Sequence, residues 1–129
     1  MVNFKNTILN GNCVNPDFGA GTGTLTSNGN NLGIDTSCNI ADGTNGDIVN
    51  AAPLLGSLQN NGGSTETHAL QAGSPAVDAG TCSGAPTTDQ RGQPRPNAIS
   101  AFCDIGAYES SFSVAPGSAD IFLPIVIKN

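Results

Sequence analysis

The chain has 129 residues, a formal net charge of −6 and only four Lys or Arg. So few cations argue against a partner such as nucleic acid or an anionic membrane surface. Seventeen glycines, eight prolines and 5% aromatic residues disfavour long helices and predict an all-β fold of short strands joined by Gly and Asn turns.

Three segments of the N-terminal part read as turns of one repeating coil. They cover residues 6–12, 24–35 and 47–58, and an Asn-Gly-Asn triplet recurs at 10–12 and 28–30. Self-similarity at a period of about 20 residues is typical of a solenoid. In a parallel β-helix the inward Ile, Leu and Val side chains stack from rung to rung, while corner Asn side chains form hydrogen-bonded ladders. We therefore expect residues 1–80 to form β-helix rungs.

The sequence pattern that predicts repeating rungs ends near residue 60. For residues 67–72 the sequence predicts a last strand or one helical turn. For residues 73–80 it predicts a short apolar strand between turns. Residues 81–110 are irregular and rich in charges, which predicts a C-terminal cap. Residues 111–129 are a linker and an apolar tail, and Pro124 limits the run at 121–127 to an edge strand or an extended tail.

Four cysteines are candidates for structural disulfides: Cys13, Cys38, Cys82 and Cys103. None of them forms the C-x-x-C spacing of a zinc or redox site. Four cysteines allow three pairings, of which nearest-neighbour pairing is the simplest hypothesis. Each such loop is worth ~3 kcal/mol in the chain-entropy model. The alternative is four buried thiols in a reducing compartment.

The C-terminal half carries strings that resemble one known family. These strings are Gly-Ser-Pro-Ala-Val-Asp-Ala-Gly at 73–80, Thr-Asp-Gln-Arg-Gly at 88–92 with Arg-Pro at 95–96, and Cys-Asp-Ile-Gly-Ala-Tyr-Glu at 103–109. Together they are similar to the signature of choice-of-anchor Q domains of secreted bacterial proteins. The resemblance spans about residues 4–110. It implies the last rungs of a right-handed parallel β-helix, with a pectate-lyase-like superfold, followed by an irregular cap containing disulfides.

The same resemblance implies an exported, surface-associated protein, with further rungs and a signal peptide upstream. No signal peptide and no apolar stretch of membrane-spanning length is visible in these residues. Proteins of this kind usually carry many rungs, whereas only two or three are readable here. The tail after Glu109 shows no sortase-type motif.

The densest group of charges lies in the expected cap. It predicts either an ion-pair network that holds loops over the open end of the solenoid, which we favour, or a carbohydrate or metal site. The candidates are Asp89, Arg91, Arg95, Asp104 and Glu109.

Other chemistry has weaker support. Asp78, Asp89 and Asp104 are the only plausible members of a glycosidase carboxylate pair, and nothing places two of them on one strand face. His68 is the only histidine, without a nucleophile-elbow string, and reads as a polar residue of the final rung. The loop 42–47 differs from an EF-hand calcium loop at its third and fifth positions, so we favour a solvated turn there over the alternative of a low-affinity calcium site.

These observations predict a structural or adhesive C-terminal module of a cell-surface β-helix protein, without catalysis of its own and without a cofactor. The expected partners are upstream rungs of the same protein and extracellular polysaccharide or cell-envelope components. Two alternatives stay open. One is a carbohydrate-binding or polysaccharide-cleaving β-helix protein whose active rungs lie upstream. The other is a small, complete, disulfide-stapled secreted domain with its own ligand.

Overall fold

The computed structural model of the chain describes residues 1–11, 13 and 24–113, so the apolar run at 121–127 lies outside the described residues. The described part is mostly β and irregular structure, and it contains no α-helix. Its elements are the strands β1 (Val2–Phe4), β2 (Ile8–Leu9), β3 (Leu25–Ser27), β4 (Leu32–Gly33), β5 (Ile48–Val49), β6 (Leu55–Gln59) and β7 (Thr67–Leu70), and the short 3-10 helix η1 (Thr44–Gly46).

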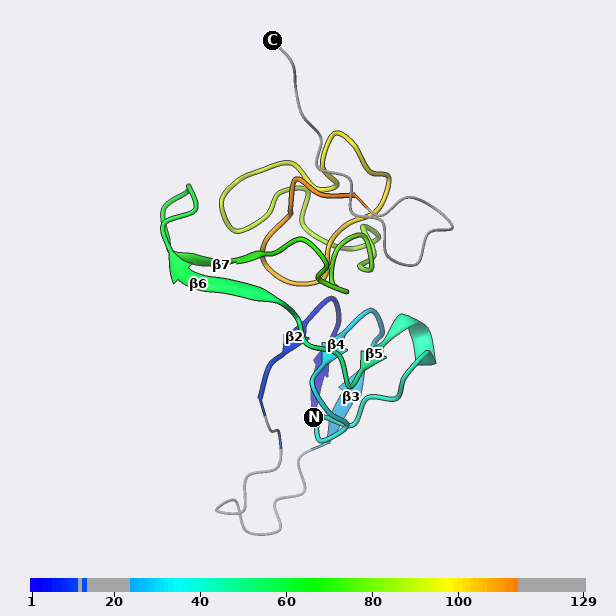
Figure 1. Cartoon of the computed structure of the whole chain (residues 1–129). Coiled ribbons are helices and arrows are strands. Elements are labelled where there is room, and N and C mark those ends of the chain that lie inside the picture. The colour runs from blue at the N-terminus through cyan, green and yellow to red at the C-terminus, as the bar shows by residue number, and fades with distance from the viewer. Residues whose placement is uncertain (12, 14–23, 114–129) are drawn as a thin grey trace.

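The N-terminal strands form two short parallel sheets (Figure 1). One sheet has the order β1-β3 and the other has the order β2-β4-β5. Ile8 lies opposite Leu32, and Leu32 lies opposite Ile48. We call β1 with β2 the first layer, β3 with β4 the second layer and β5 the third layer. Each of the three segments with a predicted rung therefore contributes a strand to one parallel stack.

A sharp corner precedes each of the three stacked aliphatic residues. Asn6, Asn30 and Gly46 stand two residues before Ile8, Leu32 and Ile48, and their φ angles are 51°, 54° and 80°. Only glycine and, to a lesser extent, asparagine adopt this left-handed conformation at little cost. The recurrent Asn and Gly residues are thus what lets each layer turn at the same place.

Polar side chains join the layers just inside this corner. The backbone N–H of Thr7 donates to Asn31 Oδ1 at 3.0 Å, and the N–H of Asn31 donates to Asp47 Oδ1 at 2.9 Å. Asn31 and Asp47 are buried, so unpaired polar atoms there would be costly. We call Thr7, Asn31 and Asp47 the polar ladder. It links the backbone of each layer to a side chain of the next.

The third predicted segment departs from the stack after β5. β6 pairs with β7 in an antiparallel hairpin, with Leu55 opposite Leu70 and Gln59 opposite Thr67. The prediction that the rung continues through residue 58 is therefore wrong for this stretch. Gly62 and Gly63, both at positive φ, let the loop between the strands reverse direction. Of the two alternatives for residues 67–72, the strand is the one found, over 67–70.

Residues 73–80 do not form the predicted apolar strand. They make consecutive turns, in which the N–H of Ser74 donates to Gln71 O and the N–H of Val77 donates to Ser74 O. The Ser74 hydroxyl donates to Pro53 O at 2.6 Å and accepts from the N–H of Ala76. This local bonding competes with strand pairing. The apolar side chains of the segment remain in the core.

One core joins the stack, the hairpin and the C-terminal loops. Its buried residues are Leu32, Leu70, Ala76, Val77 and Ile105. Because they come from distant parts of the sequence, the core ties the layers to the residues that follow them.

Two disulfides pair nearest neighbours, Cys13 with Cys38 and Cys82 with Cys103. This is the simplest of the three pairings that the sequence allows. The described residues contain no free cysteine. One disulfide joins Cys13, which follows β2, to Cys38, which follows β4. The other lies within residues 81–110, which we call the cap segment.

The cap segment reaches back along the corners of the stack. Asn6 Nδ2 donates to Thr81 O at 2.7 Å, and the N–H of Thr81 donates to Asn6 Oδ1 at 3.0 Å. The N–H of Gly106 donates to Asn6 O at 2.9 Å, and Asn30 Nδ2 donates to Ala79 O at 3.1 Å. The corner residues of the first and second layers therefore hold the cap segment and the turn before it.

Candidate functional site

The five charged residues singled out in the sequence meet in one network. Arg91 Nη2 lies 2.7 Å from Asp89 Oδ2, and Arg95 Nε lies 3.0 Å from Glu109 Oε2. All four of these side chains are at most 11% exposed. The fifth residue, Asp104, is fully buried, and its N–H donates to Glu109 Oε2 at 3.1 Å.

Asp89 gathers donors from two stretches of backbone. Its Oδ1 accepts the N–H groups of Arg91 at 2.8 Å and Gln93 at 3.0 Å. Its Oδ2 accepts the N–H of Glu109 at 2.9 Å, besides the Arg91 guanidinium. Arg91 Nη2 also donates to Glu109 O at 2.7 Å. The pair therefore fixes the turn around residue 91 against the segment that contains residue 109.

Asp104 joins three other points of the chain. Its Oδ1 accepts the N–H of Asp78 at 2.8 Å, and its Oδ2 accepts the N–H of Ser110 at 2.6 Å. Glu109 Oε1 accepts the N–H of Asn97 at 3.1 Å. Arg95 Nη2 donates to Gly106 O at 2.7 Å. These bonds connect residues 78, 97, 104 and 110 through two carboxylates.

The three carboxylates differ in the direction of their pKa shifts. Burial raises the pKa of Asp104, against the lowering effect of the N–H groups of Asp78 and Ser110. Burial likewise raises the pKa of Glu109. Burial alone would raise the pKa of Asp89 too, but the N–H of Glu109, the Arg91 guanidinium and two further backbone N–H groups hold it below its ordinary value. Asp89 is thus the member whose charge the fold stabilises.

The arrangement is suited to holding loops. Both oxygens of Asp89, Asp104 and Glu109 accept hydrogen bonds from the protein. Arg91 also stacks on the Tyr108 ring, with its guanidinium carbon 3.6 Å from the ring centroid, a contact that adds cation–π attraction.

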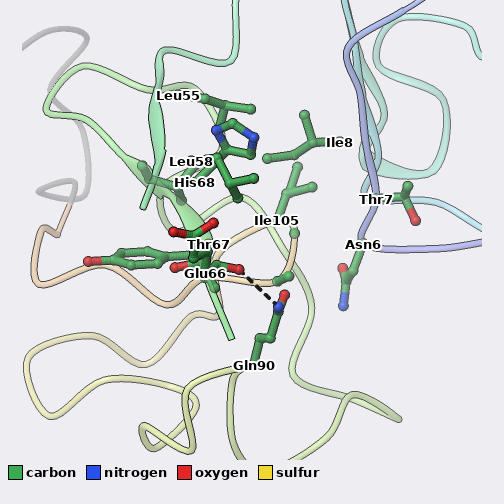
Figure 2. A pocket seen from close by; sticks show the side chains of 14 residues that line it. Asn6, Thr7, Ile8, Leu55, Leu58, Glu66, Thr67, His68, Gln90 and Ile105 are labelled. Carbon is green, nitrogen blue, oxygen red and sulfur yellow. Dashed lines mark hydrogen bonds between the residues drawn. The ribbon is translucent and has the colours of Figure 1, made fainter. Parts of the chain in front are cut away.

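A hollow of about 600 Å³ lies between the first layer, the hairpin and the cap segment. Figure 2 shows Ile8 on one side of it, with Leu55, Leu58 and Ile105 facing it. Leu58 is 55% exposed although it is a large apolar residue. Polar residues that also line it include Thr7, Glu66, Thr67, His68 and Gln90. The lining of the hollow therefore combines apolar and polar side chains, as binding surfaces do.

The other residues considered in the sequence have local structural partners. His68 lies on β7, and its Nδ1 is 2.7 Å from Gly56 O across the hairpin. In the loop 42–47, Asp42 Oδ1 accepts the N–H of Val49, and Asp47 accepts bonds from Asn31 and Ser27. Among the residues described, no three His, Cys, Asp or Glu side chains form a group that could hold a metal ion.

The polar ladder contains two residues, Thr7 and Asn31, that no sequence motif marks. Asn31 Nδ2 donates to Asp47 Oδ1 at 3.0 Å and to Ser27 Oγ at 2.9 Å. Their position in the sequence could have identified them, because Thr7, Asn31 and Asp47 each precede a stacked aliphatic residue. The unequal spacing of the layers hides this equivalence in the sequence.

No family model, curated protein or solved structure matches the chain. The resemblance to choice-of-anchor Q domains therefore stays a prediction. Within residues 1–11, 13 and 24–113 there is no helix long and apolar enough to cross a membrane.

Proposed function

We propose that this chain forms the last rungs and the cap of a right-handed parallel β-helix in an exported cell-surface protein, where it acts as a structural or adhesive module without catalysis of its own. The observation that carries the proposal is the parallel register of Ile8, Leu32 and Ile48 together with the polar ladder beside it. Stacked aliphatic residues and side-chain ladders are how solenoid rungs stabilise one another.

The two disulfides support the exported location. Disulfides persist in oxidising compartments and are rare in the cytosol. With 11% charged residues, the chain also lacks the charge density of typical globular domains. The pairs Cys13–Cys38 and Cys82–Cys103 are therefore consistent with a protein that folds outside the cytosol.

The charged network supports a bracing role for the cap segment. Its carboxylates accept backbone N–H groups from residues 78, 91, 93, 97, 104, 109 and 110. Irregular loops need such partners because they have no ladder of their own. In this proposal the cap segment and the turn before it stabilise the last rungs by holding their corners, through the bonds of Asn6 to Thr81 and of Asn30 to Ala79.

A direct test uses intact source cells and an antibody against residues 60–110. The proposal predicts that the antibody labels unpermeabilised cells, and that externally added protease removes the label. Labelling only after lysis would contradict the surface location.

A glycan panel probed with the full chain then separates an adhesive module from a purely structural one. Saturable binding supports adhesion, whereas release of a cleaved product would overturn the absence of catalysis.

A further inference from the structure

The first layer has a strand edge that faces away from the stack. Thr7 O and Leu9 O accept the N–H groups of Leu32 and Ile34 from the second layer. Because alternate residues of a strand direct their backbone groups to opposite sides, the N–H and C=O of Ile8 point away from β4. The same alternation holds in β1, where Val2 N–H and Phe4 O bond the second layer. Among the described strands, none pairs with this outer edge of β1 and β2.

The polar ladder has a direction that distinguishes the two ends. At the third layer, the N–H of Asp47 donates to Thr44 O at 2.9 Å, so it is no longer available to a following layer. At the first layer, Thr7 Oγ1 donates to Lys5 O at 3.0 Å. A hydroxyl that donates one bond still has lone pairs with which to accept another. The ladder is thus closed at Asp47 and can be extended at Thr7.

The apolar hollow lies at the same end as this acceptor. Its lining includes residues 6–8 of the first layer and none from β4 or β5. Ile8 faces the hollow together with Leu55, Leu58 and Ile105 (Figure 2). An aliphatic side chain stacked on Ile8, as Leu32 is on its other side, would enter this hollow.

We propose that the edge of β1 and β2, together with the hollow, is the docking surface for one more parallel β layer. This inference rests on the proposed function and names the partner of the stack. The incoming layer places a Val, Ile or Leu side chain in the hollow, and its strand pairs with the N–H and C=O of Ile8. The backbone N–H of the residue before that side chain donates to Thr7 Oγ1, which repeats the bond between Thr7 and Asn31.

The test adds such a layer to the full chain. A copy of residues 24–34 is fused in front of Met1 through a Gly/Ser linker as long as the stretch of chain that separates Leu9 from Leu25. The copy supplies an asparagine N–H for Thr7 and a leucine for the hollow. In urea unfolding we expect a higher midpoint and a larger m value, and a melting temperature at least about 4 °C higher.

The matched control carries Asp in place of the copied leucine, with the same length and linker. It is expected to lose the gain. Thr7→Val in the host is expected to reduce the gain, measured as the difference in unfolding midpoint between the grafted and the ungrafted Thr7→Val chains. A gain that persists in the Asp control would overturn the proposal, because the added residues would then act without entering the hollow.

A fluorescence measurement keeps the outcome clear if the grafted chain folds poorly. The chain has no Trp, so Trp in place of the copied leucine is the only indole present. Docking in the hollow is supported if the emission of this Trp is shifted to the blue, and if Leu58→Glu shifts the emission back to the red. Water-like emission in a chain whose hairpin and disulfides are intact overturns it. A native protein of only 12.9 kDa would refute the proposed function while leaving this docking result unaffected.

Discussion

Replacing Asp89 with Ala removes the carboxylate that joins the turn around residue 91 to the segment containing residue 109. Three backbone N–H groups and the Arg91 guanidinium lose their acceptor at once. An unmet buried donor costs about 1–3 kcal/mol, and breaking a buried ion pair by removing one partner costs about 3–5 kcal/mol. The Arg91 side chain is 11% exposed, so solvent can reach its guanidinium and offset part of these summed costs. We therefore expect a total loss of about 3–5 kcal/mol of unfolding free energy.

Urea unfolding of the oxidised chain measures this loss. Tyr108 is the only tyrosine and stacks on Arg91, so its fluorescence reports on the network itself, while far-UV circular dichroism reports on the whole chain. Glu66→Ala is the matched control, because it removes one exposed carboxylate and the same charge. The control is expected to change stability by less than about 0.5 kcal/mol.

The pH dependence gives a second check on the same variant. The pKa of Asp89 is lowered in the folded chain, so its contribution is present above its unfolded value, 3.8, and is lost as pH falls through the folded pKa. The difference between wild type and Asp89→Ala should therefore be full at neutral pH and shrink below about pH 4. A difference under about 1 kcal/mol at pH 7, or one that stays constant into strong acid, would refute the role given to Asp89.

Three further changes test other parts of the molecule by the same unfolding assay. Asn31→Ala should cost about 2–4 kcal/mol because it removes the middle of the polar ladder; a cost below about 1 kcal/mol would contradict this. Replacing Cys82 and Cys103 with Ser should cost ~3 kcal/mol, and an unchanged midpoint would count against the disulfide. Gly106→Ala should destabilise more than Gly84→Ala, because both have positive φ but only the former meets a side chain, at 2.9 Å; equal losses would contradict the close approach.

The stack was the part of the fold most readable from the sequence. Ile8, Leu32 and Ile48 each follow a corner of Asn or Gly, and both features have direct sequence signals: an aliphatic residue and a residue that tolerates positive φ. The nearest-neighbour disulfides were also the simplest pairing.

The hairpin could not be predicted in the same way. Leu55 and Leu58 suit a parallel rung or a hairpin strand equally well, and the choice depends on pairing with residues 67–70. The turns at 73–80 depend on the contact of Ser74 with Pro53 O, which lies far earlier in the chain. Such contacts between residues distant in sequence leave no periodic signal.

The charged network could be located from the sequence, but the role of each member could not. Asp104 is fully buried, whereas the other four residues form two ion pairs. Burial sets the direction of the pKa shift of Asp104 and Glu109, and hydrogen bonds from backbone N–H groups and Arg91 set that of Asp89. These features arise from folding of the loops, which the sequence does not display.

The mass of the native protein that carries this sequence tests the central claim most directly. An immunoblot of source cells and medium, made with an antibody against residues 60–110, gives this mass. We expect a band far above 12.9 kDa, found in the envelope or the medium, because the chain would be the end of a longer β-helix. A band at 12.9 kDa confined to the cytosol would contradict it.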